Sequence, residues 1–129
     1  MKIEHVAVWV RKLDLMREFY VTYFGGVANE KYRNEKKNYE SYFIAFDSGA
    51  RLELMQMPGI TDTTNSGHEQ FMGLTHLAFS VGSKAKVDEM TELFRKAGFE
   101  VVGEPRWTGD GYYESVILDP EKNRIEITA

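Results

Sequence analysis

The sequence contains no cysteine, and this absence excludes disulfide bonds, thiolate metal ligands and a cysteine nucleophile. It has no basic excess either, because 16 Lys and Arg face 20 Asp and Glu for a net charge of −4. That balance argues against nucleic acid or an anionic membrane as a partner. No apolar run approaches the ~20 residues of a membrane helix. The first ten residues are too short and too polar for a signal peptide. We therefore expect a soluble, cytoplasmic protein.

What is present is an ordinary globular composition, arranged as one pattern that occurs twice. Each copy has a strand of period two, an amphipathic helix and three further strands. The first copy has its strands at 5–10, 27–33, 39–46 and 51–56 and its helix at 13–24; the second has strands at 75–81, 99–103, 113–118 and 124–128 and its helix at 84–97. Residues 57–73 lack a period and read as a connection. The prediction is an α+β chain, a single domain over 1–129 made of two βαβββ modules at about 1–56 and 74–129.

Short words that recur in the same order support a true repeat. His5-Val6-Ala7 returns as His76-Leu77-Ala78, and Arg51-Leu52-Glu53-Leu54 returns as Arg124-Ile125-Glu126-Ile127. Tyr39-Glu40-Ser41 matches Tyr113-Glu114-Ser115, and Phe46-Asp47 matches Leu118-Asp119. The spacing between matching words stays within 71–74 residues, so the two copies differ only by small changes at turns.

Four side chains of the metal-ligating kind fall at equivalent strand positions: His5, Glu53, His76 and Glu126. Since side chains alternate across a strand, each lies opposite an aliphatic face that is complete without it. A lone His or Glu on a strand is usually an ordinary core or surface residue, but the repeat places both types twice. Two imidazoles and two carboxylates suit a divalent first-row cation, and nickel, cobalt, zinc, manganese and iron all accept them. A curved sheet would turn this face inward as a metal cleft.

The recurring sequence segments and the four ligand-type residues resemble those of the vicinal oxygen chelate superfamily, which includes glyoxalase I, bleomycin-resistance proteins and extradiol dioxygenases. The resemblance covers the whole chain, and its most specific part runs from Leu118-Asp119-Pro120 to Asn123-Arg124-Ile125-Glu126-Ile127. It implies a fold of paired βαβββ modules. It also implies metal ligands at His5, Glu53, His76 and Glu126, the set typical of glyoxalase I.

The ligand set separates branches of the superfamily. Extradiol dioxygenases and fosfomycin-type thiol transferases typically lack a counterpart of Glu53, methylmalonyl-CoA epimerase usually has Gln there, and bleomycin-sequestering members lack the metal set. The chain departs from many glyoxalase I sequences at Trp9, where an Arg helps bind glutathione, and at Met57, where an Asn is common. The resemblance therefore favours a metal-dependent lyase or isomerase without specifying glutathione.

The resulting hypothesis is a glyoxalase I-type enzyme for a small substrate with vicinal oxygens. Glu126 and Glu53 are the candidate catalytic bases. Candidate substrate-binding residues share their faces: Trp9, Met55, Arg51 and Arg124. The alternatives are a metal-dependent thiol transferase or dioxygenase, and a metal-free protein that binds a small molecule such as an antibiotic. A homodimer is expected, with each site completed within one chain or across two.

Overall fold

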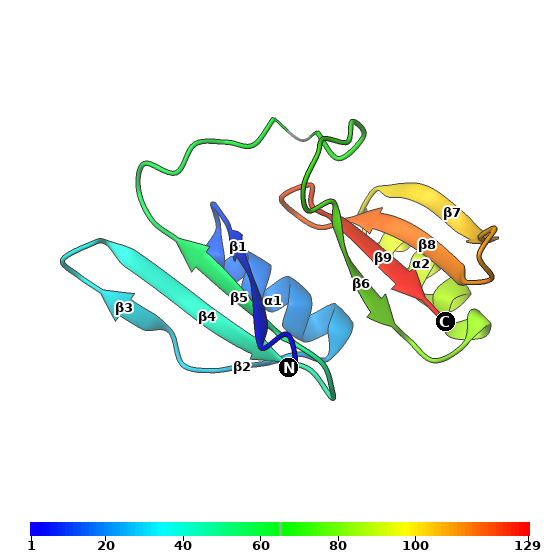
Figure 1. The fold of residues 1–129 in the computed structure, drawn as a ribbon, viewed down its shortest axis with the longest axis horizontal. Helices are drawn as coiled ribbons and strands as arrows, with labels where there is room; N and C mark the ends of the chain where they lie inside the picture. Colours follow the sequence, from blue (N-terminus) through cyan, green and yellow to red (C-terminus); the bar gives the residue numbers. More distant parts are fainter. Residues whose placement is uncertain (65) are drawn as a thin grey trace. The chain divides into compact units, whose positions relative to one another are not determined.

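The computed structural model describes residues 1–64 and 66–129. The chain forms two compact units, Met1–Asp62 and Thr63–Ala129. In the described residues each unit has one helix and one sheet (Figure 1). The α+β class with two strand–helix–strand modules is therefore confirmed.

The first unit has a five-stranded sheet in the order β1-β5-β4-β2, with β3 also pairing with β4. Strands β1 and β5 run parallel, and the other pairs are antiparallel. Its elements are β1 (His5–Trp9), α1 (Leu13–Phe24), β2 (Val27–Ala28), β3 (Tyr32–Asn34), β4 (Tyr39–Ala45) and β5 (Arg51–Gln56). The helix ends at Gly25, whose φ of 66° is a left-handed conformation that glycine adopts without strain.

The second unit has a four-stranded sheet in the order β6-β9-β8-β7. Again the first and last strands of the module, β6 and β9, run parallel. Its elements are β6 (His76–Ser80), α2 (Lys84–Lys96), β7 (Val101–Trp107), β8 (Tyr113–Leu118) and β9 (Arg124–Thr128). Ser83 caps α2, because its side chain accepts a hydrogen bond from the Lys86 N–H.

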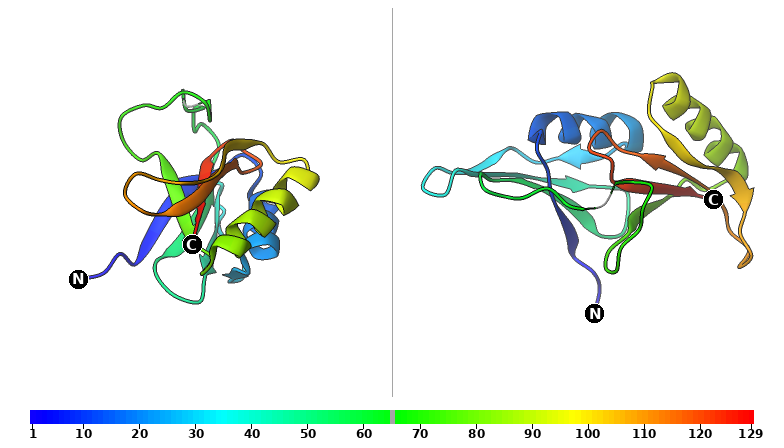
Figure 2. Two further views of the ribbon diagram at one scale, coloured as in Figure 1. Left: turned by 90° about the vertical axis from the view of Figure 1, so that its right-hand side faces the viewer. Right: turned by 90° about the horizontal axis from the view of Figure 1, so that it is seen from above.

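Each helix covers one face of its own sheet (Figure 2). The aliphatic residues that alternate with the two Glu are buried on the helix side, as the sequence predicts: Leu52, Leu54, Ile125 and Ile127. The buried helix residues are Leu13, Met16, Phe19 and Tyr20 in α1 and Val87, Met90, Thr91 and Phe94 in α2. Burial of such a side chain stabilises the fold by about 1.5–3 kcal/mol.

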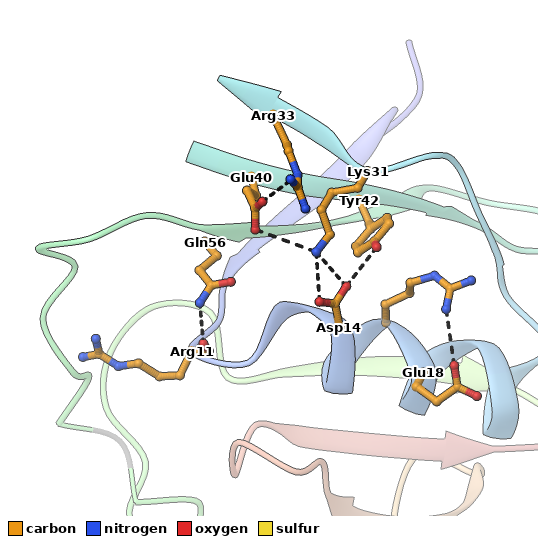
Figure 3. Close-up of polar contacts among 9 residues, drawn as sticks. Arg11, Asp14, Glu18, Lys31, Arg33, Glu40, Tyr42 and Gln56 are labelled. Atoms are coloured by element: carbon orange, nitrogen blue, oxygen red, sulfur yellow. Dashed lines mark hydrogen bonds and ion pairs between the residues drawn. The ribbon is translucent and has the colours of Figure 1, made fainter. Parts of the chain in front are cut away.

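A buried tyrosine also ties each helix to its sheet. In the first unit the Tyr42 hydroxyl donates to Asp14 at 2.9 Å, and Lys31 donates to the same carboxylate (Figure 3). Both hydrogen bonds lower the pKa of Asp14, and the bond from Lys31 has the larger effect. In the second unit the Tyr113 hydroxyl donates to Asp88 at 2.7 Å. The helices are therefore fixed by polar contacts as well as by apolar burial.

The strand predicted at 27–33 is wrong as one element, because the structure divides it into β2 and β3. Asn29 explains the break. The Asn29 N–H donates to the Phe43 carbonyl, as in a regular ladder. The Phe43 N–H, however, donates to the Asn29 side-chain oxygen at 2.8 Å instead of to the Asn29 main-chain carbonyl. A side chain that replaces a carbonyl in the ladder interrupts regular pairing.

The strand predicted at 99–103 is also wrong in its bounds, since β7 covers Val101–Trp107 and includes Pro105. Proline is tolerated there because β7 is at the edge of the sheet. Its register with β8 shifts twice, between Val101 and Gly103 and between Gly103 and Arg106. Among the helices that the structure describes, none is long and apolar enough to cross a membrane.

Candidate metal centre

His5 and Glu53 form a pair on the face of the first sheet that α1 does not cover. In the parallel β1–β5 ladder His5 is opposite Arg51 and Ala7 is opposite Glu53, so the His and the Glu lie on a diagonal. The His5 Nε2 atom lies 3.6 Å from Glu53 Oε2. The Glu53 side chain is 14% exposed and that of His5 is 40% exposed. The pair is thus held in place yet open on one side.

Tyr39 fixes the second oxygen of Glu53. Its hydroxyl donates to Glu53 Oε1 at 3.0 Å. The Tyr39 ring in turn contacts Trp9 edge to face, with a centroid distance of 6.1 Å. Burial, followed by the bond to Glu53, raises the pKa of Tyr39, so this phenol remains a donor at neutral pH. Glu53 therefore presents only Oε2 toward His5.

The second unit repeats this pair with the same register. His76 is opposite Arg124 and Ala78 is opposite Glu126 in the parallel β6–β9 ladder. The His76 Nε2 atom lies 3.0 Å from Glu126 Oε2. Both histidines therefore direct Nε2 toward a carboxylate two ladder positions along the neighbouring strand.

Glu114 lies beside Glu126, and the sequence reasoning missed it. It lies on β8 opposite Thr128, on the face of Glu126, and its side chain is 12% exposed. A hydrogen bond with Glu126, with further contributions from burial and from the charge of Glu126, raises the pKa of Glu114 to about 7. Arg106, with Nη2 at 3.4 Å, opposes that shift.

The structure also corrects the predicted repeat alignment by one residue in these strands. The ladders pair Glu53 with Phe43 and Glu126 with Val116, so the structural offset in these strands is 73 residues. Ser41 is then the counterpart of Glu114, whereas the matching words align Glu40 with it. A slip of one residue moves a side chain to the other face of a sheet.

These donors fit a divalent cation by their chemistry, since imidazole nitrogen and carboxylate oxygen are common ligands of first-row metals. Each unit supplies one such His–Glu pair. In the part of the chain that the structure describes, no three His, Asp or Glu side chains gather into one metal-holding group. The union of both pairs in a single site is therefore a proposal, argued below.

The four residues assigned to substrate share the faces of these pairs. Trp9 is exposed and Met55 is half-buried. Both arginines already have protein partners. Arg51 donates to Glu4 at 2.8 Å through Nε, and Arg124 donates to the Gly67 carbonyl at 2.7 Å. Recognition of an anionic substrate by either arginine would require it to exchange that partner.

Comparison with known proteins identifies the family of this chain. The family model of the Glyoxalase/Bleomycin resistance protein/Dioxygenase superfamily matches residues 2–127. The chain therefore belongs to this superfamily. An uncharacterized protein of Bacillus subtilis (strain 168), YqjT, is 38% identical over 65 residues. That match spans 48% of this chain and 51% of YqjT, about half the length of each.

Solved structures of the superfamily share the fold. The glyoxalase family protein from Bacillus cereus aligns with a TM-score of 0.80 at 20% identity, over 99% of this chain and 93% of that protein. The trypanothione-dependent glyoxalase I of Leishmania major aligns with a TM-score of 0.74 at 21% identity, over 99% of this chain and 86% of that protein. At such identities the likeness concerns the fold alone.

Proposed function

We propose that this chain is a divalent-metal-dependent lyase or isomerase of glyoxalase I type, acting on a small substrate with vicinal oxygens. Its metal ligands are His5, Glu53, His76 and Glu126, two from each unit. One observation carries the proposal. Both units place a His Nε2 against a Glu carboxylate at the same ladder register, and neither pair contributes to the apolar core.

The pattern is hard to explain as structural. The core of each sheet is complete on the helix side, with Leu54 and Ile127 fully buried. A salt bridge between partly exposed groups contributes only about 0–1 kcal/mol to stability. Two equivalent pairs that add so little to folding are better explained by ligand binding.

Nickel, cobalt, zinc, manganese or iron would suit these ligands. When bound, such an ion would supply Lewis acidity toward two adjacent substrate oxygens. The chain's own part is proton transfer. We assign Glu126 and Glu53 as the bases that accept the substrate's carbon-bound proton on a carboxylate oxygen and return it.

Their surroundings suit the two glutamates to different tasks. The Tyr39 hydroxyl donates to Glu53 Oε1 at 3.0 Å, so one oxygen of that carboxylate is already occupied by a hydrogen bond. Glu126 instead shares a hydrogen bond with a second carboxyl group, that of Glu114. A neighbour that itself exchanges protons near neutral pH favours Glu126 as the residue that moves the substrate proton.

For the substrate we propose contacts with Trp9 and Met55, which lie on the face of the first pair. Their apolar surface would exclude water from the bound substrate. We further propose a homodimer. The four ligands then come either from one chain or, two each, from two chains.

Metal analysis of the purified protein, followed by a substrate screen with the best metal restored, tests this function. One tightly bound divalent ion per four-ligand set, with isomerisation or lyase activity on a compound having adjacent oxygens, supports the proposal. Ring opening of an aromatic diol with dioxygen, or transfer of a thiol, would favour the alternative enzyme classes. Tight binding of a small molecule without any metal would contradict the proposal.

A further inference from the structure

The residue just before each site histidine contacts that histidine's Nδ1 atom. In the first unit Glu4 Oε2 lies 2.5 Å from His5 Nδ1, and in the second unit Thr75 Oγ1 lies 2.9 Å from His76 Nδ1. The two contacts differ in chemistry. A hydroxyl both donates and accepts, so Thr75 is compatible with a proton on either nitrogen of His76. An ionised carboxylate only accepts, so Glu4 requires the proton to be on Nδ1 of His5.

Glu4 is itself held by a second residue. Arg51 donates from Nε to Glu4 Oε1 at 2.8 Å, and its Nη2 also pairs with that oxygen. The Arg51 guanidinium keeps Glu4 ionised, because an adjacent positive charge favours the carboxylate form. The two oxygens of Glu4 are thus divided between Arg51 and His5.

Phe43 completes a closed set of contacts around the imidazole. The Arg51 guanidinium carbon lies 4.2 Å from the Phe43 ring centroid. The Phe43 ring meets the His5 ring edge to face, with a centroid distance of 5.4 Å. His5, Glu4, Arg51 and Phe43 therefore contact one another in a ring, which restricts the imidazole in both rotation and tilt.

We propose that Glu4, held by Arg51, is a positioning residue that fixes the Nδ1–H tautomer of His5 and so presents the Nε2 lone pair toward Glu53. Nε2 already faces Glu53 Oε2 at 3.6 Å. The assignment of the tautomer does not depend on the proposed function. Only the further statement that the Nε2 lone pair binds a metal rests on it. A carboxylate behind a ligating histidine orients the ring and raises its basicity, and loss of such a partner typically weakens metal affinity by 10–100-fold.

The first experiment reads the tautomer directly in the metal-free protein. Long-range ¹H–¹⁵N NMR at pH 8.5, where an ordinary imidazole is neutral, distinguishes a protonated ring nitrogen from an unprotonated one. We expect His5 to carry its proton on Nδ1 in the wild type and to shift toward the Nε2–H form in Glu4→Ala. Glu4→Gln keeps an accepting oxygen and should retain the wild-type tautomer. His76 is the internal reference and should not change.

The second experiment measures Co²⁺ affinity by isothermal titration calorimetry. Glu4→Ala should weaken binding by about 10–100-fold. Glu35→Gln, which removes one exposed carboxylate from the turn before β4, is the matched control and should bind as the wild type does. A merely structural role for Glu4 would lower the melting temperature without changing the NMR signature of His5.

The outcomes separate the two proposals. A proton on Nε2 of His5 in the wild type, or unchanged His5 shifts in Glu4→Ala, overturns the inference whether or not a metal binds. A tautomer that depends on Glu4 in a protein that binds no Co²⁺ supports the inference and contradicts the metal-dependent function.

Discussion

Glu114 on β8 and Glu126 on β9 share a hydrogen bond on the face of the second sheet that is opposite α2. Two carboxyl groups that share a hydrogen bond do not both ionise readily, and this bond, with burial and the charge of Glu126, raises the pKa of Glu114 to about 7. Below that pH the pair holds one proton between its members. Above it, two negative charges face each other, with the Arg106 guanidinium 3.4 Å from Glu114 as a partial compensation.

This relationship predicts a pH-dependent stability in the metal-free protein. The pKa of Glu114 is about 7 in the folded state and near 4.5 in the unfolded state, so the folded state binds more protons between these values. The stabilisation is present below about pH 4.5 and is lost as pH rises through about 7. Urea unfolding should show the wild type losing roughly 2–3 kcal/mol more than Glu114→Gln between pH 5 and pH 8. Parallel pH profiles for the two proteins would contradict the shared proton.

The proposed base gives a second prediction. Glu126→Gln should lower metal-dependent kcat/KM by at least about 100-fold, because an amide cannot accept the proton. The fold should remain, since the neighbours Ile125 and Ile127 stay buried on the other face. Circular dichroism and steady-state kinetics check both points. Glu89→Gln on the exposed side of α2 is the control, and unaltered turnover in Glu126→Gln would remove this residue from the mechanism.

A substitution in the apolar core should lower stability strongly and activity only slightly, the reverse of what we expect for Glu126→Gln. Ile127 is fully buried against α2, so Ile127→Ala should destabilise the protein by about 2–5 kcal/mol through lost burial and a residual cavity. Activity per folded molecule should fall far less than in Glu126→Gln. Leu93→Ala, at an exposed position on the same helix, is the control and should change the unfolding free energy by less than about 1 kcal/mol.

Much of this arrangement follows from local pattern in the sequence. The α1 bounds and those of β5, β8 and β9 agree with the prediction, because period-two and period-3.6 apolar spacing survive in the folded protein. The faces of His5, Glu53, His76 and Glu126 follow from the same alternation. The membership of the superfamily follows from the repeated words.

The features that could not be predicted from the sequence are those that depend on strand register and on individual side-chain contacts. Asn29 divides a predicted strand by one side-chain hydrogen bond. Glu114 was not among the candidate site residues, and the matching words aligned it with Glu40, whereas the ladders align it with Ser41. Glu4 and Thr75 were not noticed, although each directly precedes a site histidine. Their adjacency was a signal, but only the structure shows that their oxygens meet Nδ1.

The expected assembly gives a prediction about mass. Light scattering at micromolar concentration should report about twice the chain mass of 14.9 kDa, as an isologous dimer requires. A mass near 14.9 kDa would refute a stable dimer. Mixing a His5→Ala variant with a Glu126→Ala variant then locates the ligands. Recovered activity would mean that each site takes one His–Glu pair from each chain. In the mixed dimer, one site then combines the intact first pair of the Glu126 variant with the intact second pair of the His5 variant, so all four of its ligands are unchanged.

The most direct test of the central claim is the stoichiometry and affinity of divalent cation binding in the wild type and in four single alanine variants, at His5, Glu53, His76 and Glu126. If both His–Glu pairs hold one ion, the wild type binds one Co²⁺ per chain, and every variant loses affinity to a comparable degree, since all four remove a ligand from one centre. Two independent weak sites per chain would contradict the account. So would loss of binding in the variants of one unit while those of the other bind as tightly as the wild type.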